Sequence, residues 1–456
     1  MNIIFIVADD LGWGDVGYHN KEAITPNIDS LAYEGTRFEN FYVQPSCSPT
    51  RAAFMTGIYP YKIGIQRVLW PWSKHGIEPN FNILPKYLKK SNYETAIIGK
   101  WNLGHYRNHY LPTSKGFDYH YGSYTGSVDH YTHKYYNVHD LNENKKAVYD
   151  KGHIADLLTN KTIEKIKNRN KQKNFFYYIP FNSPHVPIKF PKKYFEKFKN
   201  IKDKKRACYL AMVNHLDFCI GKIFSCLKEE KILEKTLIWF SSDNGGYINS
   251  GSCNGEFAGG KANSSILGMG EGAIKAPNFI YYEPINEGKI DLKTCHAIDV
   301  LPTLCSLTNT TIDEDIDGID IFSTNNKIED RILIHILMGN DSNSFYGCCQ
   351  KNKIKYVIFG DKIEVYNLEK DPFEKNNIIK NNPGIELKNH LKCCFEKYKP
   401  DPIMWHQPNG YPNNFIFPKE WNSNIDRREI KILSEELFKF NFELSPVNSL
   451  GYYNLM

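Results

Sequence analysis

The stretch NIIFIVADD (residues 2–10) decides how the fold of this chain is interpreted. Its apolar run is rich in isoleucine and short enough for a strand, and Asp9 and Asp10 follow it directly. A strand that is apolar on both faces is typical of a parallel sheet covered by helices on each side. The stretch therefore predicts a central strand with two carboxylates at its carboxyl end.

Three more apolar runs repeat this arrangement. They end at Lys100, near His185, and at Asp243 with Asn244, and they read YETAIIGKW (93–101), NFFYYIPFNSPH (174–185) and TLIWFSSDNGG (236–246). Helical patterns lie between the runs, at residues 25–35, 83–92 and 204–231. Alternating strands and helices predict an α/β fold with a mixed, mostly parallel sheet flanked by helices. The polar residues at the strand ends are expected to converge on one edge, where ligands bind in such sheets.

Each of these polar residues also has an ordinary structural interpretation. Asp10 could cap the following turn, and residues 243–246 could form a simple strand-to-loop turn. Together, however, three carboxylates and an amide form a hard, all-oxygen ligand set, which suits calcium or magnesium and not zinc.

The character of the chain changes after about residue 320. The stretch KIKYVIFGDKIEVYNLEKDP (353–372) predicts two strands of a hairpin around residues 360–361. At 456 residues the chain exceeds the usual size of one compact core. We expect a catalytic α/β domain over residues 1–325 and a smaller α+β domain, built on an antiparallel sheet, over residues 326–456.

Composition and charge exclude several classes of protein. The net charge of +6 comes from scattered lysines and not from a basic stripe with interleaved aromatic residues, so nucleic acid is not an expected partner. No apolar run reaches the roughly 18 residues of a membrane span, and residues 1–10 do not resemble a signal peptide. Eleven cysteines, two pairs of them adjacent, do not indicate a disulfide framework. Cys208, Cys219 and Cys226 share one side of a predicted helix and are expected to be buried thiols.

The stretch VQPSCSPTRAAFMTG (43–57) carries the second important motif. A helix is expected to begin just after Cys47, so the cysteine lies at a helix N-terminus, where free N–H groups favour an anion. A cysteine in that position could be a nucleophile with a lowered pKa.

The motif CSPTR, with MTG after it, resembles the signature of the sulfatase family. Other segments follow in the order expected for that family: VADDLGWGDVGYH, TPNIDSLAYEGTRFENFY, GKWNLG, SPHVP, SSDNGG, DVLPTL, DGID and YNLEKDPFEKNN. The stretches IGIQRVLWPW and LPTSKGFDYHYGSYTGSVDHYTH are most similar to the arylsulfatase B branch, whose members remove 4-sulfates from N-acetylgalactosamine in glycosaminoglycans. The resemblance implies an alkaline-phosphatase-like fold and sulfuric ester hydrolysis on a sulfated carbohydrate.

The resemblance also implies a cofactor and a set of site residues. Cys47 would be converted to formylglycine by a separate formylglycine-generating enzyme, and the hydrated aldehyde would attack sulfur. One calcium ion would be held by Asp9, Asp10, residue 47, Asp243 and Asn244. Arg51 and Lys100 would orient the nucleophile. His185 and Lys261 would contact sulfate, and His185 would protonate the leaving alcohol.

The chain departs from the family pattern in three places. Asn102 in GKWNLG replaces a histidine that is expected to help deprotonate the second hydroxyl of the hydrated aldehyde, the step that expels sulfate, so slow turnover or an accumulating sulfated enzyme is predicted. The segment after Lys261 is longer than usual, which leaves Lys275 as a second candidate for the sulfate contact. Cysteines expected in arylsulfatase B disulfides are missing. The family suggests a lysosomal or secreted protein, although no signal peptide is present in these residues.

Two other functions stay open on the sequence. The first is a catalytically impaired relative that binds sulfated glycans without turnover, which Asn102 favours. The second is a phosphoester hydrolase on the same scaffold, in which the proline and arginine of the cysteine motif would have no purpose. The intact motif, the aspartates and His185 favour the sulfatase.

Overall fold

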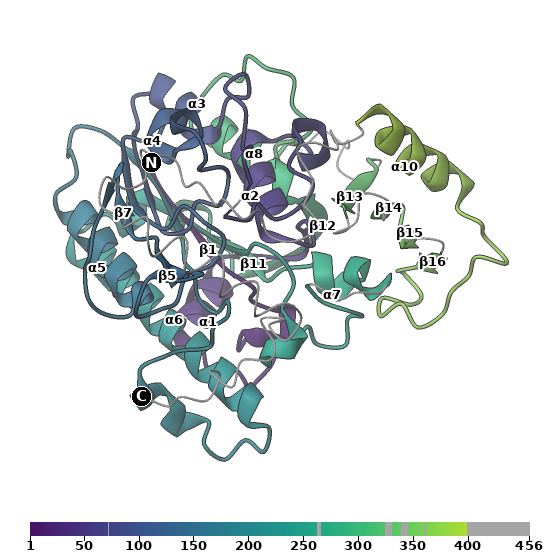
Figure 1. Ribbon diagram of the computed structural model, residues 1–456, viewed down its shortest axis with the longest axis horizontal. Helices are drawn as coiled ribbons and strands as arrows, with labels where there is room; N and C mark the ends of the chain where they lie inside the picture. Colours follow the sequence, from purple (N-terminus) through teal and green to yellow (C-terminus); the bar gives the residue numbers. More distant parts are fainter. Residues whose placement is uncertain (72, 262–265, 324–330, 339–344, 360–361, 399–456) are drawn as a thin grey trace.

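A ten-stranded mixed sheet forms the centre of the protein (Figure 1). The computed structural model describes residues 1–398, except 72, 262–265, 324–330, 339–344 and 360–361. The central strands β4, β3, β9, β1 and β10 are parallel, and β11, β7 and β8 run antiparallel to their neighbours. In spatial order the strands are β12 (Lys289–His296), β2 (Thr36–Tyr42), β11 (Asn278–Tyr281), β10 (Thr236–Ser242), β1 (Asn2–Ala8), β9 (Phe175–Pro180), β3 (Glu94–Ile98), β4 (Tyr119–Gly122), β7 (Asn142–Glu143) and β8 (Lys146–Ala147). The predicted α/β fold is confirmed.

Helices cover both faces of this sheet. Because side chains alternate along a strand, Ile4 and Ile6 of β1 pack into one core, and Phe5 and Val7 pack into the other. The first core is covered by α1 (Pro26–Glu34), α5 (Ile154–Lys167) and α6 (Lys204–Glu229). The second is covered by α2 (Cys47–Thr56), α3 (Leu84–Lys90) and α8 (Val300–Leu307). Truncating Phe5 to alanine in this position would cost about 3–5 kcal/mol of stability.

The remaining short elements of the first 325 residues lie around these layers. They are α4 (Pro112–Lys115), α7 (Glu271–Ile274) and a two-stranded sheet of β5 (Lys134–Tyr135) and β6 (Val138–His139). The helix α2 begins at Cys47 itself, with Ser46 as its N-cap residue, which confirms the predicted place of the cysteine.

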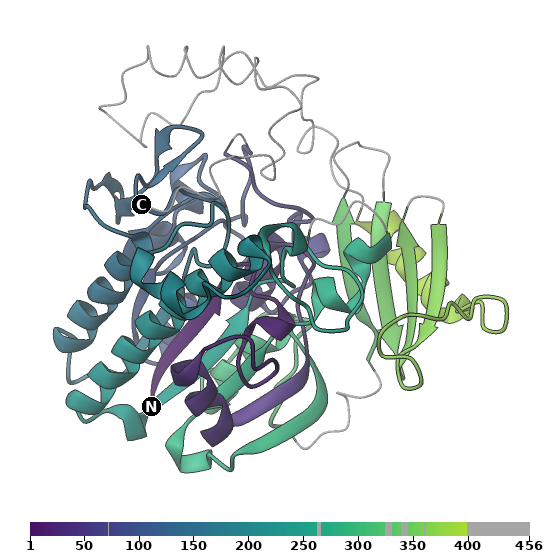
Figure 2. The ribbon, with the colours of Figure 1, turned by 90° about the horizontal axis from the view of Figure 1, so that it is seen from below.

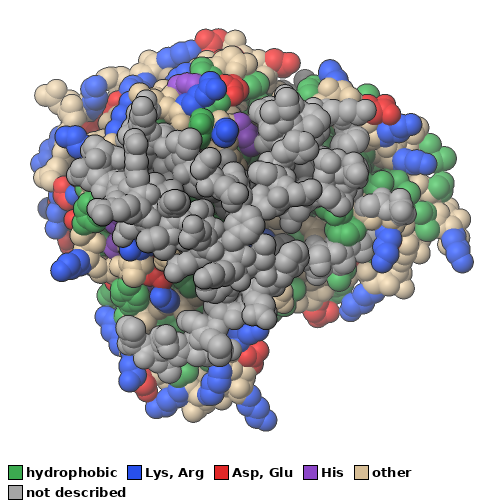
Figure 3. All heavy atoms as spheres, viewed as in Figure 1, with side chains coloured by type: hydrophobic (Ala, Val, Ile, Leu, Met, Phe, Trp, Pro, Cys, Tyr) green, Lys and Arg blue, Asp and Glu red, His purple; other side chains and the backbone are tan. Residues whose placement is uncertain are grey.

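Helix α6 is a core helix whose length and composition would also suit a membrane span. It is the one described helix that passes that test, and 78% of its most apolar window is buried inside the protein. Cys208, Cys219 and Cys226 lie on it as buried free thiols, as predicted. Figure 3 shows lysine and arginine side chains spread over the visible surface outside the grey atoms, in agreement with the scattered charge of the sequence.

A four-stranded antiparallel sheet stands beside the large one (Figure 2). The predicted pairing of residues 353–372 is confirmed, although the turn at residues 360–361 lies outside the described residues. The elements are β13 (Leu333–Met338), β14 (Phe345–Lys351), β15 (Ile354–Phe359), β16 (Lys362–Asn367) and α10 (Ile385–Lys397). The boundary at residue 325 stays a prediction, since it falls among residues 324–330, and residues 399–456 also lie outside the described part.

Buried charges join the small sheet to the rest of the protein. The ammonium of Lys355 on β15 is fully buried and lies 3.0 Å from Glu271 Oε1 and 2.8 Å from Glu374 Oε1. Tyr42 donates a hydrogen bond to the other oxygen of Glu271, and the backbone N–H of Glu271 donates to the other oxygen of Glu374. Three of the four carboxylate oxygens therefore accept a hydrogen bond, and the fourth, Glu374 Oε1, has no hydrogen-bond partner among the described residues but lies 2.8 Å from the Lys355 ammonium. We call these residues, Lys355, Glu271, Glu374 and Tyr42, the seam cluster.

Candidate active site

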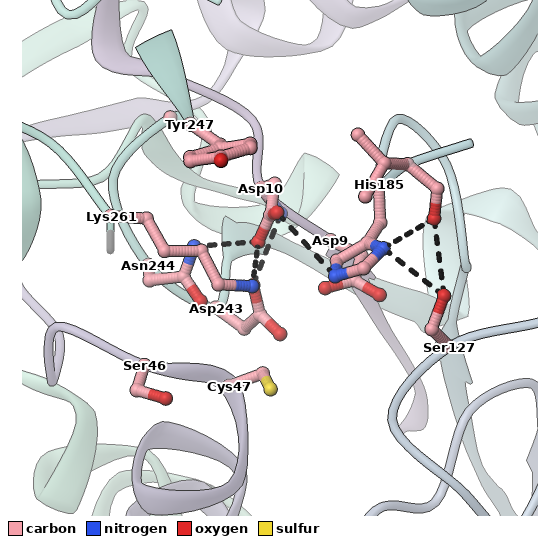
Figure 4. A network of polar contacts seen from close by, with 12 residues as sticks. Asp9, Asp10, Ser46, Cys47, Ser127, His185, Asp243, Asn244, Tyr247 and Lys261 are labelled. Carbon is pink, nitrogen blue, oxygen red and sulfur yellow. Dashed lines mark hydrogen bonds and ion pairs between the residues drawn. The ribbon is translucent and has the colours of Figure 1, made fainter. Parts of the chain in front are cut away.

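The parallel central strands bring the predicted site residues to one edge of the sheet. Strand β1 lies between β9 and β10, and β3 lies beside β9. Asp9 and Asp10 follow the carboxyl end of β1, and Asp243 follows that of β10. Lys100 lies two residues after β3, and His185 lies five residues after β9. The convergence expected from the sequence is confirmed in the described structure (Figure 4).

The end of β1 has an unusual backbone that turns Asp10 away from the strand. Asp10 has a φ of 68°, in the left-handed region that aspartate and asparagine tolerate better than most residues. Its backbone N–H donates to Asp243 Oδ1 at 3.2 Å, which ties the end of β1 to the end of β10. The turn separates the side chains of Asp9 and Asp10 while keeping both in the same cluster.

Three buried carboxylates are each paired with one cation. Arg51 donates to Asp243 Oδ2 through Nε at 2.9 Å and Nη2 at 2.7 Å. Lys100 Nζ lies 2.7 Å from Asp9 Oδ2, and Lys261 Nζ lies 2.5 Å from Asp10 Oδ1. We call these six residues, together with Asn244, whose Nδ2 donates to Asp10 Oδ1 at 2.8 Å, the aspartate cluster. Arg51 is placed there by α2, one turn after Cys47, and is fully buried.

The neighbouring cations lower the pKa values of Asp9 and Asp10 by more than burial raises them. Burial alone would raise the pKa of Asp9, but Lys100, His185 and Arg51 lower it below its usual value. Burial would also raise the pKa of Asp10, and Lys261 and His185 lower it in the same way. Both carboxylates are therefore ionised at neutral pH.

Two buried oxygens in the cluster lack a hydrogen-bond donor. Within the described residues, Asp9 Oδ1 and Asn244 Oδ1 have no hydrogen-bond partner. Arg51 Nη2 lies 3.8 Å from that Asp9 oxygen, too far for a hydrogen bond. A buried oxygen without a partner costs free energy. Two such oxygens beside three carboxylates therefore fit a hard divalent cation such as calcium. Ligand-capable atoms of Asp9, Asp10 and His185 also lie within 4.8 Å of one another.

Cys47 forms a hydrogen bond with Asn102, the residue that departs from the family pattern. Its thiol donates to Asn102 Oδ1 at 3.1 Å, and Ser48 Oγ donates to the same oxygen at 2.7 Å. The Asn102 amide donates to Leu69 O at 3.0 Å. Asn102 is buried and has a φ of 53°. Its amide therefore holds the start of α2 against the segment that contains Leu69.

His185 is fixed in one tautomer by its neighbours. Its Nδ1 lies 2.6 Å from Val186 O and therefore carries the proton that is donated to this carbonyl. Nε2 is left to face Asp10 Oδ2, at 3.7 Å. Burial lowers the pKa of His185, partly offset by Asp10 and Asp9. Nε2 is thus the nitrogen that can gain or lose a proton.

Sequence reasoning missed two residues of this site. Ser127 Oγ donates to Val186 O at 3.1 Å and lies 3.4 Å from His185 Nδ1, so it supports the histidine. The ring of Tyr247 lies beside Asp10 and Lys261 in Figure 4. Ser127 occurs in one of the segments that resemble the family, and Tyr247 follows SSDNGG directly, but neither carries a local signal of its own.

The two candidate lysines lie in different surroundings. Lys261 is in the aspartate cluster, and Asp10 raises its pKa against the effect of burial. Lys275 follows α7 and lies with its ammonium 4.4 Å from the centre of the Phe257 ring. Burial lowers the pKa of Lys275, with Glu271 and Glu39 acting in the opposite direction. The structure thus brings Lys261, and not Lys275, to the other predicted residues.

A mixed, mostly parallel sheet with a nucleophile-bearing helix and a carboxylate cluster at its edge defines an α/β protein of the alkaline-phosphatase-like class. The sulfatase family model matches residues 1–310. Mouse arylsulfatase J is 37% identical over 335 residues, which cover 71% of this chain and 55% of that protein. The chain belongs to the sulfatase family.

Other relatives support the same family. Human N-acetylgalactosamine-6-sulfatase is 29% identical over 71% of this chain and 65% of its own length. The chain thus spans 55% and 65% of the length of these two relatives. The crystal structure of Ps i-CgsB in complex with k-i-k-neocarrahexaose superposes with a TM-score of 0.78 at 30% identity, over 90% of this chain and 94% of that one. The finer resemblance to arylsulfatase B stays a prediction.

Proposed function

We propose that this protein hydrolyses sulfuric esters of a sulfated sugar. The observation that carries the proposal is the placement of Cys47, at the N-terminus of α2, opposite the aspartate cluster and His185 in a member of the sulfatase family (Figure 4). Three cations beside a nucleophile position suit an ester whose attacked group is anionic, as a sulfate group is.

Calcium is the metal that the aspartate cluster fits. Asp9, Asp10, Asp243 and Asn244 would hold it together with residue 47, and the two orphan oxygens would gain a partner. The ion would polarise the nucleophile and neutralise sulfate oxygens. A bound cation would also replace Lys261 as the neutralising partner of Asp10. The Lys261 ammonium would then be free to contact a sulfate oxygen.

Formylglycine at position 47 would supply a hydrated aldehyde with two hydroxyl groups, one to attack sulfur and a second whose deprotonation would allow sulfate to be expelled and the aldehyde to return. Arg51 and Lys100 would hold the carboxylates around it in place through their ion pairs. His185 would donate to the leaving alcohol from Nε2 when the ring is doubly protonated, because its Nδ1 proton is held by Val186 O. Cys47 is only 2% exposed, so a formylglycine-generating enzyme would have to act before the chain folds.

For the substrate, we propose a glycosaminoglycan carrying N-acetylgalactosamine 4-sulfate. The resemblance of residues 63–72 and 111–133 to arylsulfatase B supports the 4-position. The name of the human relative, N-acetylgalactosamine-6-sulfatase, makes the 6-sulfate the direct competitor. The oligosaccharide bound to Ps i-CgsB supports a sugar chain as the class of ligand.

The test compares sulfate release from 4-sulfated and 6-sulfated N-acetylgalactosamine, with an aryl phosphate as the third substrate. The mass of the peptide that contains position 47 is measured on the same preparation. We expect formylglycine, sulfate release that disappears in Cys47→Ala, and no comparable phosphate release. Formylglycine-containing protein that releases phosphate and no sulfate would contradict the proposal, and preference for the 6-sulfate would correct only the substrate.

Asn102 favours a second function, the binding of sulfated glycans with little turnover. An amide cannot accept a proton near neutral pH, and both ends of this amide are already committed to Ser48, Cys47 and Leu69. A histidine could keep the same bonds, since one ring nitrogen can accept from Ser48 and the other can donate to Leu69.

Asn102→His therefore separates the two functions. If Asn102 limits turnover, the variant should raise kcat by about 10²-fold or more, in the range of one general base, and a burst of one product per site should disappear. Asn102→Gln, which keeps an amide, is the control. Equal kcat in wild type and Asn102→His, with no burst in either, would show that Asn102 does not impair the enzyme.

A further inference from the structure

A second cluster of metal-ligating side chains lies between helices α5 and α6. His153 precedes α5, Asp156 lies in its first turn, and His215 lies on α6. One ligand-capable atom of each lies within 4.8 Å of the others. His153 and His215 are buried, whereas the Asp156 side chain is 37% exposed. The cluster thus has a closed inner side and one side open to water.

His153 is already oriented as a metal-binding histidine usually is. Its Nε2 donates to the backbone oxygen of Lys189 at 2.9 Å. Its Nδ1 therefore has a lone pair, which at present accepts a long bond of 3.2 Å from Ala155 N as the N-cap of α5. Histidine ligands typically donate their second ring N–H to a carbonyl or carboxylate in this way.

His215 and Asp156 provide the other two ligands. Nε2 of His215 lies 3.1 Å from Asp156 Oδ1, and its buried Nδ1 has no hydrogen-bond partner among the described residues. The rings of His153 and His215 are 4.5 Å apart, between centroids. The thiol of Cys219, one turn further along α6, lies 3.9 Å from the same Asp156 oxygen.

We propose that His153, Asp156 and His215 bind a zinc-class divalent ion. Two imidazoles and one carboxylate suit zinc, whereas the all-oxygen aspartate cluster suits calcium. At bond lengths of about 2.1 Å, the ligand atoms would be roughly 3.4 Å apart, which small side-chain rotations reach from the present spacing. Water completes the coordination on the exposed side of Asp156.

This site is connected to the segment that carries His185. The His130 ring stacks on His153, with 5.1 Å between centroids, and His130 Nε2 donates to the backbone oxygen of His185 at 3.0 Å. His153 holds the other end of the same segment through Lys189 O. An ion on His153 would therefore stiffen residues 185–189, and His185 with them.

The test uses the full chain, stripped of metal and then reloaded with calcium. We expect it to bind one equivalent of Zn²⁺, to show the absorption of tetrahedral Co²⁺ when cobalt replaces zinc, and to melt at a higher temperature with zinc. Asp156→Asn and His215→Gln should each weaken Zn²⁺ binding by at least about 10²-fold. His139→Gln, which alters a histidine bonded to Val148 O, is the matched control and should bind zinc normally.

Asp10→Asn distinguishes the two metal sites, because it alters only the aspartate cluster. Zinc binding that survives in Asp156→Asn and His215→Gln would overturn the proposal, and so would binding that is lost only in Asp10→Asn. A folding defect is not expected in Asp156→Asn, because the substitution is isosteric and the Asp156 side chain is partly exposed. The melting temperature of this variant without zinc should therefore match that of the wild type. None of these readouts depends on sulfate release, so they can fail while the proposed hydrolase stands.

Discussion

The aspartate cluster and the seam cluster both bury several charges, but they satisfy them differently. In the seam cluster, each oxygen of Glu271 and Glu374 lies within 3.0 Å of a hydrogen-bond donor or of the Lys355 ammonium, which bridges the two residues. In the aspartate cluster, each carboxylate has its own cation, yet Asp9 Oδ1 and Asn244 Oδ1 have no donor. The seam cluster thus has a donor or cation for each carboxylate oxygen, whereas the aspartate cluster leaves two oxygens without a donor.

This difference separates a structural role from a functional one. A buried ion cluster whose oxygens are all paired gains nothing from a further ligand. Unpaired buried oxygens cost free energy in the folded protein, and a bound cation recovers it. Burial and charge alone therefore do not identify a site, and oxygens without a nearby donor or cation, gathered beside carboxylates, are the additional sign of one.

Among the changes that test this comparison, removal of calcium should have the largest effect on sulfate release and on stability. A calcium chelator should reduce sulfate release by at least about 10³-fold, as expected when a major electrostatic contribution is lost. The free energy of unfolding should fall by about 3–4 kcal/mol relative to protein at 100 to 1,000 times the calcium Kd. Activity assays and calorimetric melting with and without calcium provide the measurement, and unchanged activity in the chelator would contradict a metal in the aspartate cluster.

Lys355→Met should destabilise the protein strongly without affecting calcium binding. It leaves two carboxylates buried without their cation, which costs about 3–5 kcal/mol. A triple variant that also carries Glu271→Gln and Glu374→Gln should recover part of this loss, because no buried charge remains unpaired. Urea unfolding measures both. A single variant as stable as wild type would show that the seam cluster is not held by its charges.

Lys261→Ala and Lys275→Ala test the two lysines that lie near the two clusters. Lys261→Ala should lower kcat/KM for a sulfated sugar by about 10²-fold through loss of a sulfate contact. Lys275→Ala should change it by less than about 3-fold, since its ammonium lies over the Phe257 ring. Steady-state kinetics decide the assignment, and the reverse order would make Lys275 the sulfate contact.

Asp129→Asn should have the smallest effect, since Asp129 is a partly exposed carboxylate. Burial alone would raise the pKa of Asp129, but hydrogen bonds from Lys189, Thr132 and Tyr131 lower it to about 2. A carboxylate with a lowered pKa stabilises the fold above its unfolded pKa of about 3.9 and loses this as the pH falls through about 2.

The substitution should therefore cost about 1 kcal/mol at pH 7, a value reduced for solvent screening, and less at about pH 3. Urea unfolding at both pH values measures the difference. Lys189→Met, which removes the partner, should show the same trend. A loss of stability that is equal at the two pH values would exclude the ionisation of Asp129 as its source.

Much of the fold and of the site could be predicted from local patterns in the sequence. Runs such as residues 2–10 are short, apolar and followed by polar residues, so both the strands and the edge where they end can be inferred. The place of Cys47 followed from Pro49 and the helical residues after it. The resemblance to a family supplied Lys261, because no local pattern connects it with Asp10.

Contacts between distant segments could not be predicted in this way. Ser127 reaches His185 across 58 residues, and nothing in its own surroundings in the sequence indicates that partner. The cluster of His153, Asp156 and His215 depends on how α5 packs against α6, which periodicity does not determine. Asn102 was recognised only as a departure from a motif, and its bonds to Ser48 and Leu69 required coordinates.

The seam cluster also bears on the order in which the chain can complete its fold. The backbone N–H of Glu271 finds its acceptor in Glu374, 103 residues later. The N–H of Gly245, next to Asn244, bonds to Ala273 O, two residues after Glu271. During synthesis, the stretch from Glu271 to Ala273, which supports the segment beside Asn244, therefore gains its anchor on Glu374 only after residue 374 has left the ribosome. A fragment that ends at residue 325 would contain every proposed site residue and would still lack that anchor.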